Sequence, residues 1–423
     1  MLITSFLYDT LLLLGALLYL PINAWQILWQ KKAKRWIFSR FKAPSMLEKK
    51  KEVIWLHAVS LGETKALLTL LPWIKKDNPD ALLLVTVMTV TAWQEAQKNN
   101  HLFDNLSYLP LDLSWIMRRM VARLNLKLLI LVEGDFWLHM VYYAKKKGAR
   151  IALANGCISE TSSKMYSLLP FMKKHLFSQI DVYALQAEHY IKGFKALNIA
   201  LNKIKVTGNI KLSSAQVRKK NTPAKIPFKA ETKLITIGCS HPGEETSICK
   251  ALLPLIEQDP LLVLAFAPRH LDRAIQVQKE LSSLVGTCDN LASMHEGMHA
   301  GSQIVVIDQM GLLNTWYARS ILAIVAGSFV PGVGGHNLFE PILSGAIPLF
   351  GPFVERQLGL RDLIVNGRAG LCLPMNKLLD GVSTLLEDLS YRNQLKAAGK
   401  VLREESAKNA FKTWDYISSY CPV

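Results

Sequence analysis

Short apolar runs recur along the chain, and each is followed by a glycine or polar cluster and then by a segment with helical spacing. In the first half these runs cover residues 52–56, 81–87, 128–132, 150–154, 182–185 and 204–206. Between the first two runs, residues 64–75 repeat apolar side chains three and four positions apart, which is the spacing of one helix face. Strands that alternate with helices in this way predict an α/β protein with a doubly wound parallel sheet.

The pattern breaks near residue 221, where Asn221-Thr-Pro-Ala-Lys-Ile-Pro227 is typical of a linker. It then resumes, with apolar runs at residues 234–238, 261–266, 304–307, 321–325 and 346–350. A chain of 423 residues is long enough for two domains of ordinary size. We therefore expect two Rossmann-like domains, residues 31–220 and 221–423, that face a cleft. This is the GT-B plan of many glycosyltransferases that use nucleotide sugars.

The first segment of the chain has a different pattern. Residues 2–29 are nearly all apolar, with Asp9 as the single charge, and a basic cluster follows at residues 31–35. About 20 apolar residues are enough to span a bilayer. No Lys or Arg precedes the run, so an uncleaved anchor is favoured over a signal peptide, and the basic cluster places the rest of the chain in the cytoplasm. We expect residues 1–30 to form a membrane-anchor helix, although a proline within them leaves open a helix that lies in the membrane interface.

The segment from residue 326 to residue 341 predicts a phosphate-binding turn. An apolar run leads into three glycines and three polar side chains, namely Gly332, Gly334, Gly335, His336, Asn337 and Glu340. Glycines let a backbone approach a ligand, and the expected helix that contains the polar residues would offer free N–H groups at its start. A tight turn with Asn337 as an ordinary N-cap is the alternative. Elsewhere in this half, Arg269 ends a strand where it suits phosphate or carboxylate, and Gly311 lies beside an expected helix start.

In the first half, polar residues follow the expected strands. In a doubly wound sheet the ligand lies outside the carboxyl ends of the strands. That position is expected for Ser60, Gly62, Glu63, Glu133, Asp135 and Asn155. Glu63 is a candidate general base, while the alternative is that it only complements the helix dipole. Glu133 and Asp135 could share a proton or orient an acceptor, and the alternative is that they only bond to nearby backbone.

Composition and charge narrow the class of partner. The six cysteines are scattered without zinc-like spacing, which suits free thiols in a reducing compartment. The net charge of +17 fits nucleic acid, an anionic membrane surface or an acidic substrate. The basic clusters at residues 145–147, 173–174 and 218–220 lie apart and no RNA-binding motif is present, so nucleic acid is disfavoured as a partner.

Five motifs occur in order and together carry a family resemblance. They are His57-Ala-Val-Ser-Leu-Gly-Glu63, Gly208-Asn-Ile-Lys211, Pro268-Arg-His270, Asp308-Gln-Met-Gly311 and Gly334-Gly-His-Asn-Leu-Phe-Glu-Pro341. From about residue 30 to residue 360 the chain resembles the 3-deoxy-D-manno-oct-2-ulosonic acid (Kdo) transferases of Gram-negative bacteria. The resemblance implies a GT-B enzyme that moves Kdo from CMP-Kdo to a lipid A precursor, lipid IVA, with inversion and without a metal or other cofactor. It also implies catalytic domains on the cytoplasmic side of the inner membrane, where the acceptor and the anionic membrane surface are the partners.

The same resemblance assigns residues to roles. Glu63 would be the catalytic base, and Glu133 would be the first acid of the family pattern Glu-Thr-Glu-Leu-Trp-Pro-Asn. The donor side would comprise Arg269, His270, Met310, Gly311, Gly334, Gly335, His336, Asn337 and Glu340. The acceptor side would comprise Ser60, Gly62, Asp135 and Asn155.

Two departures from the family pattern lie on the acceptor side. Leu138-His139 stands where the family has Pro-Asn, and Cys157 replaces a family arginine. Both bear on acceptor geometry and on the number of Kdo residues added. The competing hypothesis is another GT-B nucleotide-sugar transferase that acts on a lipid, and a basic nucleic-acid-binding protein is a remote third.

Overall fold

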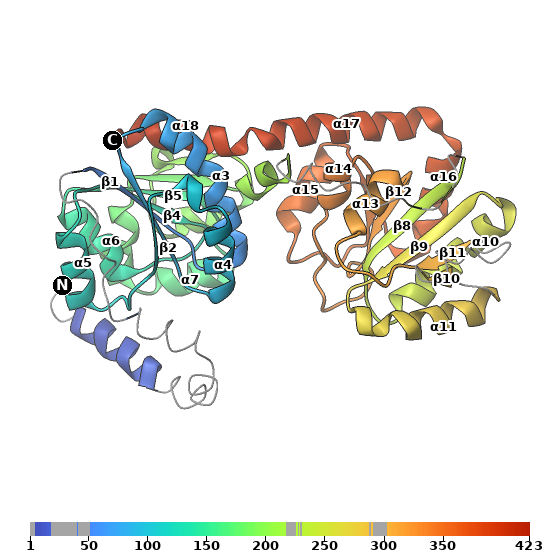
Figure 1. Cartoon of the computed structure of the whole chain (residues 1–423), viewed down its shortest axis with the longest axis horizontal. Coiled ribbons are helices and arrows are strands. Elements are labelled where there is room, and N and C mark those ends of the chain that lie inside the picture. The colour runs from blue at the N-terminus through green and yellow to red at the C-terminus, as the bar shows by residue number, and fades with distance from the viewer. Residues whose placement is uncertain are drawn as a thin grey trace. The chain divides into compact units, whose positions relative to one another are not determined.

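The computed structural model describes residues 5–17, 40, 51–216, 226, 228, 231–286, 289–290 and 303–423. It divides into two compact units, Met1–Ala215 with Ser406–Val423 and Gln216–Glu405. Within the described residues each unit is built on a seven-stranded sheet whose paired strands are parallel (Figure 1). The prediction of two doubly wound α/β domains is confirmed.

The first sheet has the strand order β3-β2-β1-β4-β5-β6-β7. Its strands are β1 (Val53–His57), β2 (Leu82–Val87), β3 (Asn105–Tyr108), β4 (Leu126–Val132), β5 (Arg150–Gly156), β6 (Val182–Leu185) and β7 (Ile204–Val206). Its helices are α3 (Leu61–Asp77), α4 (Val90–Lys98), α5 (Ser114–Ala122), α6 (Leu138–Lys146), α7 (Glu160–Ser167), α8 (Pro170–His175), α9 (Ile191–Ala196), α18 (Asn409–Tyr420) and the 3-10 turn η5 (Ile210–Gln216). The order changes direction between β1 and β4, which is where ligands bind in folds of this class.

Side chains of β1 alternate between two apolar cores, one on each face of the sheet. Trp55 packs in one core with residues of β4 and β6, whereas Leu56 packs in the other. The second core also contains Trp414 of α18, whose indole Nε1 donates to Asp77 at 2.7 Å. The sequence assigned residues 221–423 to one domain, but residues 406–423 cross back and pack on the first unit.

The second sheet has the order β10-β11-β9-β8-β12-β13-β14. Its strands are β8 (Lys233–Ser240), β9 (Leu262–Pro268), β10 (Asp289–Asn290), β11 (Ile304–Val306), β12 (Leu322–Val325), β13 (Ile347–Phe350) and β14 (Leu371–Cys372). Its helices are α10 (Glu244–Gln258), α11 (Ala274–Val285), α13 (Leu313–Arg319), α14 (Glu340–Ser344), α15 (Leu358–Asn366), α16 (Leu378–Glu387) and α17 (Leu389–Ala407). The neighbouring strands β11, β9, β8 and β12 are parallel. Their carboxyl ends therefore bring the four loops that follow them to one edge of this sheet.

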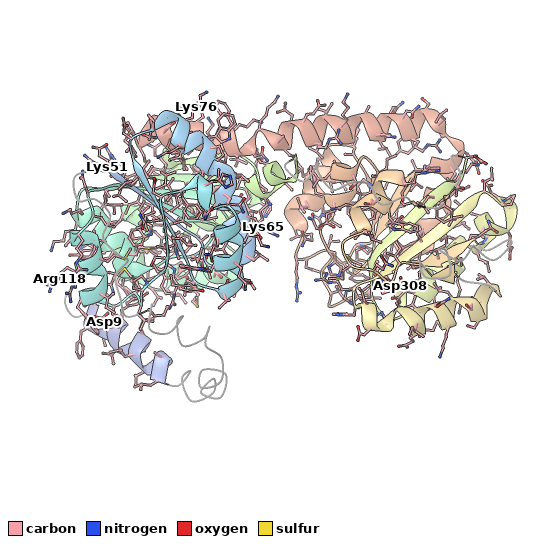
Figure 2. The ribbon with its side chains drawn as sticks, in the orientation of Figure 1. Asp9, Lys51, Lys65, Lys76, Arg118 and Asp308 are labelled. Carbon is pink, nitrogen blue, oxygen red and sulfur yellow. The ribbon has the colours of Figure 1, made fainter. Side chains whose placement is uncertain are left out.

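Residues 5–17 form a helix whose polar side chains contact the first unit (Figures 1 and 2). The carboxylate of Asp9 accepts hydrogen bonds from the backbone N of Ser114 at 3.0 Å and from its Oγ at 2.6 Å. Tyr8 donates to Asp112 Oδ2 at 3.0 Å. No helix in the described part of the chain is long and apolar enough to cross a membrane. The expected anchor is therefore unsupported, and most of it, residues 1–4 and 18–30, lies outside the described residues.

Candidate active site

Glu63 lies in the first turn of α3, where its carboxylate is held by the residues before it. Ser60 is the N-cap: its Oγ accepts from the backbone N of Glu63 and donates to Glu63 Oε1 at 2.7 Å. The backbone N of Val59 donates to Glu63 Oε2, also at 2.7 Å. This reciprocal pattern is a capping box, which explains why Ser60 and Glu63 stand three residues apart. The carboxylate is thus fixed at the carboxyl end of β1.

Asp135 and Glu63 are joined by a side-chain hydrogen bond and differ in pKa. Burial raises the pKa of Glu63, but hydrogen bonds from Asp135, Ser60 and Val59 outweigh burial and bring it below its ordinary value. The pKa of Asp135 rises to about 8 because the group is buried, because it is bonded to Glu63, and because Glu63 and Glu133 are negative. At neutral pH Asp135 therefore keeps its proton and donates a hydrogen bond to the ionised Glu63.

Glu133, directly after β4, contacts the end of β5 and the start of η5. It accepts a hydrogen bond from Asn155 Nδ2 at 3.1 Å and forms an ion pair with Lys211. Asn155 in turn accepts from the backbone N of Ile210 at 2.9 Å, which fixes the loop that carries Lys211. Glu133 and Asn155 both have positive φ, at 67° and 56°. Such left-handed backbone in non-glycine residues is uncommon and concentrates at functional sites.

In the second unit, the segment after β12 is folded around a buried carboxylate. Both oxygens of Glu244 accept from the backbone N of Gly327, at 2.9 and 2.7 Å, and Phe329 N adds a bond of 3.0 Å. Glu244 also accepts from the backbone N of His241 at 3.0 Å. One side chain at the start of α10 thus ties the loop after β8 to the loop after β12.

The expected helix around the glycine cluster is shorter than the sequence predicted. His336 and Asn337 precede α14, which begins only at Glu340 and has five residues. Asn337 Oδ1 accepts from Phe339 N at 3.1 Å and its amide lies 3.4 Å from Glu340 Oε1, so Asn337 is not the N-cap. The expectation that the helix contains His336 and Asn337 is therefore wrong. Gly334 and Gly335 have φ of 82° and 81°, because this segment is an irregular turn.

His336 contacts a second histidine that the sequence analysis did not select. Its Nε2 lies 2.7 Å from Nε2 of His241, and the two rings stack with centroids 5.1 Å apart and planes 9° apart. His270 meets His241 edge-on at 6.2 Å. Arg269 and His270 are exposed at the end of β9, with Arg269 N bonded to the carbonyl of Ser240.

Met310 and Gly311 follow β11 at the same end of the sheet. Met310 is 80% exposed, and Gly311 has φ of 85° with open space around it. Nearby, Asp308 Oδ1 is buried without a hydrogen-bond partner among the described residues (Figure 2). A buried acceptor without a hydrogen bond lowers the stability of the fold unless a ligand binds it. This end of the sheet can therefore accept a hydrogen bond from a ligand. No group of three or more His, Cys, Asp or Glu in the described chain could hold a metal ion.

Comparisons with known proteins agree with the motifs. A family model described as 3-Deoxy-D-manno-octulosonic-acid transferase (kdotransferase) matches residues 35–214. The 3-deoxy-D-manno-octulosonic acid transferase of Chlamydia pneumoniae is 31% identical over 98% of this chain and 96% of its own length. The chain belongs to the Kdo transferase family. The Haemophilus influenzae family member is 26% identical, with 87% of each chain covered.

Solved structures of other enzymes share the fold of this Kdo-transferase family member. The UDP-GlcNAc 2-epimerase from Neisseria meningitidis has a TM-score of 0.56 and 16% identity, covering 84% of this chain and all of its own. A glycosyltransferase from Rickettsia africae has a TM-score of 0.58 and 12% identity, covering 88% of this chain and 98% of its own. Similarity at this level of identity establishes the two-domain GT-B fold of the Kdo transferase and nothing about its substrate.

The two departures from the Kdo-transferase pattern have different surroundings. Cys157 lies beside the carboxylates, where burial, followed by the charge of Glu133, raises the pKa of its thiol to about 12. His139 is fully buried away from them. Its Nδ1 lies 2.7 Å from the carbonyl oxygen of Asp112, and its Nε2 lies 2.9 Å from Ser5 Oγ. The second departure therefore serves the contact with the helix over residues 5–17.

The structure adds three residues to the predicted site of the Kdo transferase: Lys211, His241 and Glu244. Lys211 is the last residue of the Gly208–Lys211 motif, and its Nζ lies 3.5 Å from where a Cβ of Gly62 would stand. His241 and Glu244 lie in the polar segment directly after a buried strand. That position was the available signal, because polar residues after the carboxyl end of a parallel strand face the ligand.

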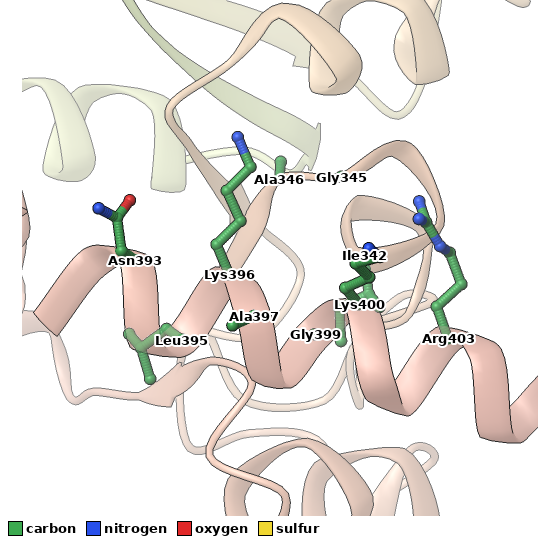
Figure 3. A pocket seen from close by; sticks show the side chains of 10 residues that line it. All are labelled: Ile342, Gly345, Ala346, Asn393, Leu395, Lys396, Ala397, Gly399, Lys400 and Arg403. Atoms are coloured by element: carbon green, nitrogen blue, oxygen red, sulfur yellow. The ribbon is translucent and has the colours of Figure 1, made fainter. Parts of the chain in front are cut away.

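A separate cavity of about 350 Å³ lies between α14 and α17 in the second unit (Figure 3). Its cationic lining residues are Lys396, Lys400 and Arg403, and Arg403 Nη1 lies 3.5 Å from the carbonyl oxygen of Leu343. None of the residues predicted for the donor or the acceptor lines it. This cavity is thus distinct from the residues that carry the chemistry.

Proposed function

We propose that this chain transfers Kdo from CMP-Kdo to lipid IVA, by an inverting and metal-independent mechanism, in lipopolysaccharide core synthesis. The observation that carries the proposal is the Glu63–Asp135 pair, a fixed ionised carboxylate with a protonated neighbour, in a chain that aligns along nearly its whole length with Kdo transferases. A carboxylate held in this way is ready to accept a proton from a sugar hydroxyl.

In the proposed step, the acceptor hydroxyl gives its proton to Glu63 while its oxygen forms a bond to the anomeric carbon of Kdo. The bond from that carbon to the phosphate oxygen breaks, and its electron pair leaves with CMP. Asp135 holds Glu63 in place through their hydrogen bond, and the ion pair with Lys211 beside them opposes the burial that raises the pKa of Glu133. On the second unit, Arg269 and the backbone of the segment around Gly334 and Gly335 bind the phosphate of the nucleotide.

The acceptor side of the proposal includes the cytoplasmic surface of the inner membrane. The net charge of +17 suits an anionic leaflet and a phosphorylated glycolipid. The helix over residues 5–17 adds an apolar surface, since Phe6, Leu11 and Leu17 are 71%, 68% and 62% exposed. Interfacial membrane binding combines apolar side chains with basic residues, and a basic cluster follows in the sequence at residues 31–35.

Incubation of the full-length chain with CMP-Kdo, lipid IVA and EDTA, followed by mass spectrometry of the lipid, tests the reaction and counts the sugars transferred. We expect addition of one or more Kdo residues, and NMR of the product reports the anomeric configuration. Unmodified lipid with an active reference transferase run in parallel would contradict the proposal. Thermal shift with CMP and UDP tests the alternative: stabilisation by UDP but not by CMP would favour a different nucleotide-sugar enzyme.

A further inference from the structure

The contact between His241 and His336 defines how many protons the pair can hold. With 2.7 Å between the two Nε2 atoms, one nitrogen carries the proton and the other accepts it. The neutral pair meets this condition, and so does a pair with one additional proton, in which an imidazolium donates to an imidazole. Two imidazolium rings would direct N–H groups at each other. The pair can therefore change its charge from 0 to +1 without rearranging.

The surrounding backbone keeps the two rings together. Gly327 has φ of 72°, and a Cβ there would lie 2.6 Å from His336 Cδ2. A side chain at this position would displace the ring, so glycine is required both for conformation and for space. Glu244 binds the backbone N of both Gly327 and His241, so the loops that carry the two rings share one anchor. Both histidines are only partly buried, which leaves them accessible to a ligand.

The charges that face the pair come from the residues that follow β9, namely Arg269, His270 and Arg273, and from Glu245 of α10. Burial, followed by His241, Arg269 and His270, lowers the pKa of His336 to about 4. Burial and then His270 lower the pKa of His241, Arg273 and Arg269 lower it further, and Glu245 opposes them. Arg273 is already paired with Glu245 at 2.9 Å, whereas Arg269 has no carboxylate partner among the described residues. An anion at Arg269 would offset the positive charges that keep the pair neutral.

We propose that the His241–His336 pair is a proton-accepting unit of the nucleotide site, which takes up one proton when the phosphate of the nucleotide becomes a dianion. The proposal rests on the function proposed above. In CMP-Kdo the phosphate is a diester with one negative charge, and breaking the bond to Kdo leaves a monoester with two. The proton of the acceptor hydroxyl goes to Glu63, and the proton of the histidine pair comes from solvent. The pair thereby binds the dianionic leaving group more strongly than the donor, which favours cleavage of the bond between Kdo and CMP.

Calorimetry with CMP tests the proposal on the full-length protein. Titrations at pH 7.5 in buffers with different ionisation enthalpies give the number of protons taken up, and at this pH CMP is largely dianionic because its second pKa is about 6. We expect uptake on the order of one proton per CMP bound, so that binding tightens as pH falls, by up to about tenfold per pH unit. The monomethyl phosphate ester of CMP, a monoanion like the donor, is expected to cause much less uptake.

Two variants distinguish proton uptake by the His241–His336 pair from proton uptake elsewhere in the protein. His241→Asn should abolish most of the uptake and weaken CMP more than the methyl ester, whereas His101→Asn, an exposed histidine of the first unit, should change neither. Histidine ¹⁵N NMR of the wild-type chain gives the same information without mutation, since CMP should convert one ring to imidazolium. CMP binding without proton uptake would overturn this proposal and leave the proposed function intact. Binding of UDP in place of CMP would overturn the proposed function itself.

Discussion

The chemistry of the first unit depends on two carboxyl groups that differ in protonation. Glu63 accepts hydrogen bonds from Val59 and Ser60, which stabilise its ionised form. Asp135 has no such donors among the described residues, and Glu63 and Glu133 add negative charge beside it. Carboxyl groups whose pKa values are pushed apart are a common basis for assigning acid and base roles. Glu63 is therefore the carboxylate that is ionised and able to accept a proton at neutral pH, and Asp135 is the positioning residue. Each assignment leads to its own experiment.

Glu63→Ala should lower the rate of Kdo transfer by about 10²–10⁴-fold, the usual contribution of a general base. CMP affinity should change by less than about twofold, because Glu63 contributes to the first unit and Arg269 to the second. Initial rates and CMP calorimetry measure the two quantities, with Glu63→Gln as the variant that preserves shape but not basicity. Loss of CMP binding in Glu63→Ala would move this residue to the donor side.

Asp135→Asn should change how stability depends on pH. The unfolded chain ionises this carboxyl above about pH 4, whereas the folded chain retains the proton up to about pH 8. The folded state thus binds more protons in that window, so this group makes the wild-type protein less stable as pH rises through it. Asparagine cannot ionise, so the Tm of Asp135→Asn relative to wild type should rise between pH 6 and pH 9. A constant difference in Tm over this range would show that Asp135 is already ionised in the fold.

At the scale of elements, the sequence predicted strands better than the turns that follow them. Buried parallel strands are continuous apolar runs, so β1, β4 and β12 could be predicted from the order of apolar residues alone. The helix expected to contain Asn337 begins only at Glu340. Before it, the backbone of Gly335 donates to Gly327 and that of Gly334 accepts from Arg356. The pattern of residues along one segment does not encode such contacts. The position of Glu63 was predictable because the capping box is local.

Two glycines of the loop after β12 allow a matched comparison. Gly327 and Gly332 both have positive φ, so alanine introduces about 1 kcal/mol of backbone strain at either position. Only at Gly327 would the new Cβ meet His336, since Gly332 has open space around it. Gly327→Ala should therefore weaken CMP at least tenfold more than Gly332→Ala in calorimetry. Equal losses for the two variants would mean that the position of His336 does not matter for the nucleotide.

At the scale of the whole molecule, the first unit contains both described ends of the chain. Trp414 bonds to Asp77 across 337 positions of sequence, and Asp9 bonds to Ser114 across 105. Neither contact has a local signature: the sequence assigned α18 to the second domain by order and residues 1–30 to the membrane by hydropathy. Hydropathy missed that Asp9 is buried at 7% exposure while Leu11, two positions on, is 68% exposed. The polar side of this helix faces the protein and the apolar side faces outward.

That arrangement predicts opposite sensitivities on the two sides of the helix. Asp9→Ala removes the acceptor for Ser114 N and Oγ, and a buried donor left without a partner costs about 1–3 kcal/mol. Leu11→Ala removes only exposed apolar surface, so it should leave local stability nearly unchanged. Hydrogen exchange of the full-length protein should therefore show faster exchange in residues 5–17 and at the start of α5 for Asp9→Ala, and wild-type rates there for Leu11→Ala. Peptides of β8 and β9 provide the internal reference, since they belong to the other unit. If Leu11→Ala released the helix and Asp9→Ala did not, the apolar side would be the side that holds the helix to the protein. That apolar side would then not be available to contact a membrane.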